Sequence, residues 1–145
     1  MIPEDGTAIA LVLADEPAAP LREVILDGLR GYNSAAFDPA PTIRTLAVAI
    51  EQDGAAVGGL WGRTGWGWLV IELIFVPESL RGRGLARRLI GMAEDEARRR
   101  GCHAAWLDTL NPEALRLYQR LGYGEFGALD DYPVGGRRVF LQKRL

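Results

Sequence analysis

A turn rich in glycine and arginine is the segment of this sequence best suited to chemistry. Residues 81–86 read Arg-Gly-Arg-Gly-Leu-Ala and lie between an apolar run and a segment with apolar residues at helical spacing. Glycines let the backbone turn sharply and approach a ligand closely, and amides at the start of a helix carry partial positive charge. Guanidinium groups suit phosphate oxygens. The turn therefore predicts a socket for a phosphate or pyrophosphate. The alternative is an exposed turn whose arginines serve solubility.

Two other phosphate-binding motifs do not match this turn. The pattern G-x-x-x-x-G-K-[ST] of P-loop proteins is missing from the sequence. The dinucleotide fingerprint needs a third glycine and an acidic residue roughly 20 positions further on, and neither is present here.

Glu72 and Tyr118 are the side chains that could move protons. Glu72 interrupts an apolar run and, on regular strand geometry, shares a face with Val70, Ile74 and Val76. A carboxylate in such a run costs free energy unless it is paired, hydrated or used. Tyr118 recurs at helical spacing with apolar neighbours. The alternatives are an exposed or arginine-paired glutamate and a core tyrosine.

The elements that must position these residues follow from periodicity and turn signals. Apolar periodicity predicts a first helix through Leu21 to Tyr32, a second that ends at Gly101, and a third capped by Asn111. Turns are expected at Asp53-Gly54 and Thr64-Gly65. Strands are expected at residues 7–14, 42–51, 55–63, 66–76, 102–109, 126–129 and 138–141. This order predicts a mixed α/β or α+β sheet.

Composition limits the function classes. The chain has 145 residues, of which 48% are hydrophobic and 25% charged, values typical of one globular domain over residues 1–145. The net charge of -2 argues against a dedicated nucleic-acid binder. A single cysteine, Cys102, fits a reducing cytoplasm. The longest apolar run falls short of the roughly 20 residues that cross a membrane, and we expect no signal peptide and no metal site.

Two motifs together resemble those of the GNAT N-acetyltransferase family. The first is Val76-Pro77-Glu78-Ser79-Leu80 followed by Arg81-x-x-Gly84-x-Ala86 and a helix. The second is Asn111-Pro112-x-Ala114-x-x-Leu117-Tyr118-x-x-Leu121-Gly122-Tyr123. They occur in the family's order and spacing, and the resemblance is clear over residues 72–126. Residues 126–133 also resemble a subgroup of small bacterial members of this family.

The resemblance implies a fold and a cosubstrate. The fold would be a mostly antiparallel sheet of 6–7 strands with about four helices, in which two parallel strands, about residues 69–76 and 103–109, splay apart around acetyl-CoA. The backbone of Ile74, Phe75 and Val76 would pair with the pantetheine arm. Asn111 would lie beside that arm, although capping its helix explains it equally well. The pyrophosphate would be held by the amides of Arg81, Gly82, Arg83, Gly84, Leu85 and Ala86.

The same resemblance implies direct transfer of acetyl from acetyl-CoA to a primary amine of a small molecule or peptide in a ternary complex. Tyr118 would protonate the leaving thiolate, and Glu72 would act as general base, directly or through water. Substrate residues would be Tyr32, Asp130, Asp131 and Tyr132, with Trp61, Trp66 and Trp68 at other pocket positions; the alternatives are solvated loop acids and tryptophans of the core or of a dimer surface. The resemblance also allows a homodimer. Two alternatives are an acyl-CoA sensor without turnover and a protein N-terminal acetyltransferase, although Trp106 replaces the glutamate of that subgroup.

Overall fold

The computed structural model describes residues 7–37 and 41–145. The chain divides into two compact units, Met1–Ala40 and Pro41–Leu145. Each unit is described by itself.

The N-terminal unit holds one helix and no strand among its described residues. Residues 7–14 form no ladder, so the strand predicted there is wrong. The apolar residues that suggested it, such as Ile9 and Leu11, are exposed. A strand needs a hydrogen-bonded neighbour, and the described part of this unit supplies none. The first predicted helix is confirmed as α1 (Ala19–Ala35), with proline in its first turn.

The C-terminal unit is built on one sheet of six strands in the order β1-β2-β3-β4-β6-β5. All neighbours pair antiparallel except β3 and β4, which run parallel. Within its described residues the C-terminal unit has two α-helices and one short 3-10 helix, η1 (Glu78–Leu80); with α1 of the N-terminal unit these compare with the about four helices that the resemblance implied. The strands are β1 (Arg44–Gln52), β2 (Ala55–Gly65), β3 (Trp68–Phe75), β4 (Ala104–Thr109), β5 (Gly124–Asp130) and β6 (Arg137–Arg144).

The two hairpin turns of the first half differ in how well the sequence located them. Asp53 and Gly54 both have positive φ, 53° and 79°, as a tight hairpin turn requires. The second turn was predicted at Thr64-Gly65, which is wrong, because β2 continues through Gly65. Trp66 and Gly67 make the turn instead, with φ of 55° and 78°. The sequence signal was ambiguous because Gly65 is the last residue of β2, whereas Gly67 lies in the turn.

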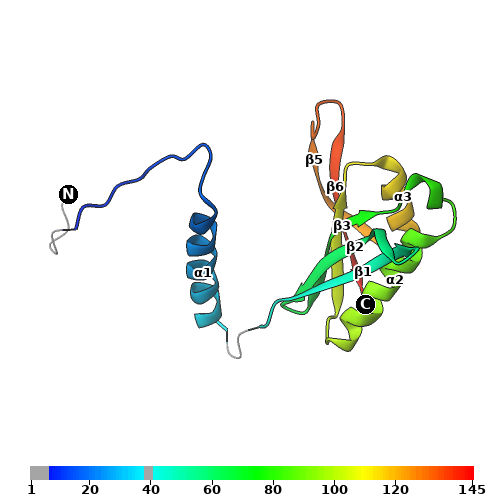
Figure 1. The fold of residues 1–145 in the computed structure, drawn as a ribbon, viewed down its shortest axis with the longest axis horizontal. Coiled ribbons are helices and arrows are strands. Elements are labelled where there is room, and N and C mark those ends of the chain that lie inside the picture. Colours follow the sequence, from blue (N-terminus) through cyan, green and yellow to red (C-terminus); the bar gives the residue numbers. More distant parts are fainter. Residues whose placement is uncertain (1–6, 38–40) are drawn as a thin grey trace. The chain divides into compact units, whose positions relative to one another are not determined.

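Helices α2 (Leu85–Arg99) and α3 (Pro112–Arg120) pack on one face of the sheet (Figure 1). Leu89 and Ile90 of α2 and Tyr118 of α3 share one buried cluster with residues of five strands, among them Leu69, Leu107 and Leu141. Leu69, Ile90, Leu107 and Leu141 are almost completely buried. This packing fixes both helices against the middle of the sheet, where β3 and β4 meet.

A buried ion pair fastens α2 to the last strand. The Tyr123 hydroxyl donates to the Glu94 carboxylate at 2.8 Å, and Lys143 Nζ lies 3.0 Å from the same carboxylate. Burial, followed by the charge of Glu94, raises the pKa of Tyr123. Because Glu94 is bonded by two donors, its charge is tolerated inside the core.

The start of α2 depends on glycine. Gly84 precedes the helix with φ of 73°, and Gly82 has φ of 77°. A side chain at either position meets no other atom, so the requirement is conformational rather than steric. Gly91, inside α2, also has open space around it but has no unusual φ.

This difference gives paired predictions for stability. Gly84→Ala forces a Cβ into the left-handed region and lowers the free energy of unfolding by about 1 kcal/mol. Gly91→Ala, the matched control, raises it by about 0.5–1 kcal/mol, because alanine loses less conformational freedom in a helix. Urea denaturation measures both. Equal shifts of the same sign in the two variants would contradict the left-handed geometry at Gly84.

Candidate functional site

Strands β3 and β4 pair at one end and then part. Their register consists of Trp68 opposite Ala104, Leu69 opposite Ala105 and Val70 opposite Trp106. Both strands continue beyond these pairs, to Phe75 and Thr109, without bonding to each other. The splay predicted for these two strands is therefore present. It leaves backbone groups along the later part of β3 available for a ligand.

A β-bulge at Glu72 changes which side chains face the helices. Trp61 pairs with Leu73 and Gly62 pairs with Ile71, so Glu72 has no partner residue on β2. Ile71 belongs to the core, and Ile74 and Val76 pack against it. The predicted common face of Glu72, Ile74 and Val76 is therefore wrong, because one extra residue shifts the alternation of the strand.

Glu72 lies on the other face of the sheet and pairs with Arg63. Arg63 stands opposite Val70, and both line a hollow of about 640 Å³ on that face. The other walls of the hollow are Ile43, Gly65, Trp66, Trp68, Trp106, Phe126, Phe140 and Gln142. The contact that the sequence left open, pairing with an arginine, is thus the one observed. The role of Glu72 as a base stays a prediction.

A groove of about 660 Å³ lies at the open end of the splay. Its walls come from β3, the glycine turn, the start of α2 and one side of α3. Nearly all the predicted cosubstrate residues line it: Ile74, Phe75, Val76, Arg81, Gly82, Gly84, Leu85, Ala86 and Asn111. Two predicted residues do not, Arg83 and Tyr118. Residues that the sequence analysis missed are Leu80, Arg87, Glu113, Ala114, Leu117 and Arg120.

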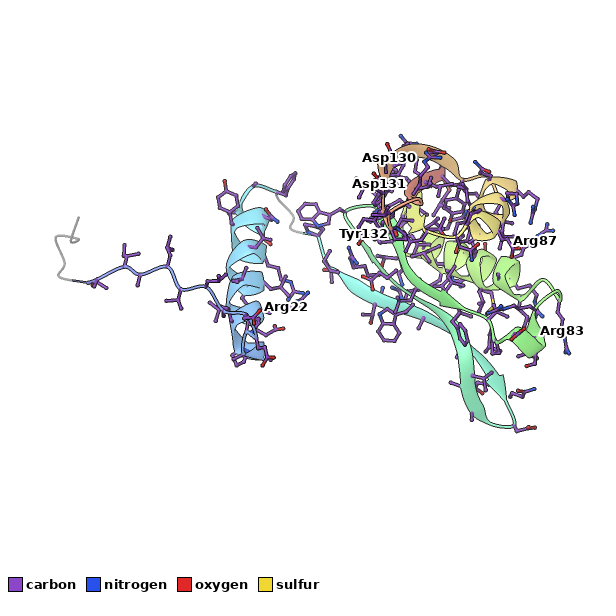
Figure 2. The ribbon with its side chains drawn as sticks, turned by 90° about the horizontal axis from the view of Figure 1, so that it is seen from above. Arg22, Arg83, Arg87, Asp130, Asp131 and Tyr132 are labelled. Carbon is purple, nitrogen blue, oxygen red and sulfur yellow. The ribbon has the colours of Figure 1, made fainter. Side chains whose placement is uncertain are left out.

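The turn and the cap give this groove its polar ends. Arg81 donates from Nε to the Val76 carbonyl at 3.1 Å, which ties the turn to the end of β3. Asn111 accepts hydrogen bonds from the amides of Glu113 at 2.8 Å and Ala114 at 3.4 Å. The capping role of Asn111 is confirmed, and the same residue lines the groove. Figure 2 shows Arg83 on the turn and Arg87 on α2.

Tyr118 is a buried side chain of α3 and belongs to the hydrophobic core. It is 9% exposed, and its ring meets the edge of the Tyr123 ring at a centroid distance of 6.5 Å. Burial raises the pKa of Tyr118, and the negative charge of Asp108 raises it further. Both effects favour the neutral phenol. The Tyr118 hydroxyl therefore keeps its proton at neutral pH, and its role as general acid stays a prediction.

Asp108, Arg138 and Tyr132 form a network that the sequence analysis missed in part. Arg138 Nε donates to Asp108 at 2.8 Å, and Arg138 Nη1 donates to the Tyr132 hydroxyl at 3.1 Å. The guanidinium also lies over the rings of Tyr132 and Phe140, 5.1 and 5.3 Å from their centres. Asp108 stands opposite Phe140 in the ladder. A carboxylate inside an apolar strand, the signal noticed at Glu72, would also have identified Asp108.

The other predicted substrate residues have local roles or lie in the N-terminal unit. Asp130 lies 3.8 Å from Arg137 and is almost fully exposed. Asp131 accepts a bond from the Gly135 amide at 3.4 Å within the same hairpin. Figure 2 shows both acids beside Tyr132. Tyr32 is an exposed residue of α1, in the separate N-terminal unit.

Within the described residues, no group of three or more histidine, cysteine or acidic side chains could hold a metal ion. No helix in that same part of the chain has the length and apolar character needed to cross a membrane.

Residues 10–123 match the family model described as "Acetyltransferase (GNAT) family". Acetyltransferase Atu2258 of Agrobacterium fabrum is 45% identical over 134 residues, which cover 92% of this chain and 97% of that protein. Blasticidin-S acetyltransferase of Streptomyces morookaense is 39% identical over 98 residues, or 67% of this chain and 72% of that protein.

Solved structures share the fold of this chain. The crystal structure of a proposed acetyltransferase from Agrobacterium tumefaciens has a TM-score of 0.90 and 43% identity, covering 94% of this chain and 100% of that one. A streptothricin-acetyltransferase-like protein of Bacillus anthracis, solved in complex with acetyl coenzyme A, shares the fold at a TM-score of 0.62 and 20% identity, over 70% of this chain and 62% of that one.

The Asp108 network predicts a change in the titration of Tyr118. Asp108→Asn removes a negative charge and leaves Arg138 unpaired, and both changes favour the phenolate. The pKa of Tyr118 should therefore fall. ¹³C NMR of labelled tyrosine across alkaline pH measures this shift, within the range in which circular dichroism shows folded protein. The control is Glu125→Gln, which removes a β5 carboxylate that is paired with Arg137 of β6. It should leave the pKa of Tyr118 unchanged. An unaltered pKa in Asp108→Asn would contradict the coupling.

Proposed function

Because this chain belongs to the GNAT family of acetyltransferases, we propose that it transfers an acetyl group from acetyl-CoA directly to a primary amine of a small molecule or peptide. The observation that carries the proposal is the groove at the parted ends of β3 and β4, into which the phosphate-binding turn opens. An elongated ligand with anionic groups at one end and amides along its length matches such a groove.

The residues of the groove fit acetyl-CoA in their chemistry. The edge of Ile74, Phe75 and Val76 offers backbone groups to the amides of a pantetheine arm, apart from the Val76 carbonyl, which Arg81 already bonds. The free amides at the start of α2 and the Arg81 guanidinium offer positive charge to a pyrophosphate. When bound, acetyl-CoA supplies a thioester, an activated acyl group whose leaving group is a thiolate.

The remaining chemistry belongs to side chains of this protein. The Tyr118 hydroxyl donates its proton to the sulfur as the C–S bond breaks. The amine gives up a proton, which Glu72 accepts directly or through water. An amide of β3 donates a hydrogen bond to the oxygen that gains negative charge during attack. These roles balance the proton lost by the amine against the one gained by the thiolate.

The acceptor is proposed to approach from the face of the sheet that carries Glu72. That face has the aromatic hollow beside Arg63 and Trp106, and two acids, Glu72 and Asp108, on the strands that part. Aromatic rings and carboxylates together suit a cationic amine. A relative named for blasticidin S makes that compound a sensible member of a test panel.

An acetylation screen tests this proposal. The protein is incubated with acetyl-CoA and a panel of polyamines, aminoglycosides, amino acid derivatives, blasticidin S and N-terminal peptides. Mass spectrometry should detect a gain of one acetyl group on an amine, together with release of CoA thiol. Binding of acetyl-CoA without acetylation of any amine would favour a sensor that lacks turnover.

Substitution of Tyr118 tests its role in the reaction. With an acceptor from the screen, Tyr118→Phe should lower kcat by about 10²–10⁴-fold, the usual contribution of a general acid. The Kd for acetyl-CoA should change little. Tyr123→Phe is the control, since it also removes a buried tyrosine hydroxyl, one that donates to Glu94 and has no role in the proposed reaction. A wild-type kcat in Tyr118→Phe would remove this tyrosine from the mechanism.

A further inference from the structure

Two arginines missed by the sequence analysis line the groove from opposite helices. Arg87 is in the first turn of α2, and Arg120 is the last residue of α3. The motif that predicted the phosphate socket contains neither of them. Their presence in the same groove raises the question of which anion they serve.

Both guanidiniums are available to a ligand. Among the described residues, no carboxylate forms an ion pair with Arg87 or with Arg120. Arg81 also lines the groove, but its Nε is bonded to the Val76 carbonyl, which holds it at the turn that the proposed function assigns to the pyrophosphate. Several other arginines are occupied by acids, as Arg98 is by Asp95 and Arg138 is by Asp108.

On each helix only one of the arginines near the groove lines it. On α3, Glu113, Leu117 and Arg120 line the groove at helical spacing, whereas Arg116 does not. On α2, Arg87 lines the groove and Arg88 does not. The one acid in the lining, Glu113, is seven residues from Arg120, or about 10 Å along the helix. Glu113 is therefore too far from Arg120 to pair with it.

We propose that Arg87 and Arg120 bind the 3′-phosphate of coenzyme A and make the protein select CoA over dephospho-CoA. The inference rests on the proposed function, in which the turn amides hold the pyrophosphate. The 3′-phosphate is then the anionic group of the ligand that is left without a partner. A phosphomonoester carries nearly two negative charges at neutral pH, so two guanidiniums from separate helices match it in charge and in number of donors.

A plainer role exists for each residue and makes a different prediction. Arg120 lies in the last turn of α3, where a positive charge complements the helix dipole. Arg87 is on the outside of α2 and could serve solubility. In those roles the substitutions would change stability or solubility, but they would not distinguish two ligands that differ by one phosphate.

The test compares binding of CoA and 3′-dephospho-CoA by isothermal titration calorimetry at one fixed ionic strength. Wild-type protein should bind CoA at least about tenfold more tightly, the effect of one or two charge-assisted hydrogen bonds at a partly exposed site. Arg87→Gln and Arg120→Gln should each weaken CoA binding several-fold and leave dephospho-CoA unchanged. The matched controls, Arg88→Gln and Arg116→Gln, should leave both affinities unchanged.

Small competitors separate this phosphate from the pyrophosphate. Adenosine 3′,5′-bisphosphate should displace CoA at lower concentration than ADP does from wild-type protein, and this advantage should disappear in Arg120→Gln. Equal affinity of the wild type for CoA and dephospho-CoA would overturn the proposal. Equal losses of affinity for both ligands in the variants would do the same, and neither result would count against acetyl-CoA binding in the groove. No binding of CoA or acetyl-CoA at all would instead refute the proposed function.

Discussion

Two parallel strands that stop hydrogen bonding to each other leave backbone groups that must find another partner. In this protein β3 and β4 share three residue pairs, from Trp68 to Val70 on one strand and Ala104 to Trp106 on the other. Beyond them the edge of β3 has no strand to pair with, and apart from the Val76 carbonyl, which Arg81 bonds, its backbone groups are left to water or to a ligand. The groove beside the glycine turn depends on this parting.

The packing of the core holds the strands in this arrangement. Leu69 and Ala105 are completely buried at the paired end, and α2 and α3 rest on the same cluster. The bulge at Glu72 then turns Ile74 toward the helices and keeps Glu72 on the opposite face, beside Arg63. One inserted residue thus decides that Ile74 faces the helices and that Glu72 faces the other side of the sheet.

Local signals predicted most of the C-terminal unit. The cap at Asn111, the glycine after α2 and the Asp53-Gly54 turn specify their own backbone, so each is found where the sequence placed it. The second turn was displaced by two residues because Gly65 and Gly67 are equally plausible by composition. The strand at residues 7–14 failed because a strand is defined by its neighbours rather than by its own residues.

In the candidate site, too, the residues of a local motif were predictable and those brought together by packing were not. Residues joined by one continuous motif, such as Gly82, Gly84 and Ala86, were found together. Arg87 and Arg120 were not, because their meeting in one groove depends on how two helices pack. The face of Glu72 could not be deduced either, since a bulge is visible only in the register with β2.

Hydrogen exchange along β3 tests the central claim most directly. If the free edge of β3 receives the donor as an added strand, saturating acetyl-CoA should slow exchange of at least one amide among Ile74, Phe75 and Val76. The amides of Leu69 and Val70, at the paired end, should change little by comparison. Binding of acetyl-CoA with no added protection at Ile74, Phe75 and Val76 would contradict the account.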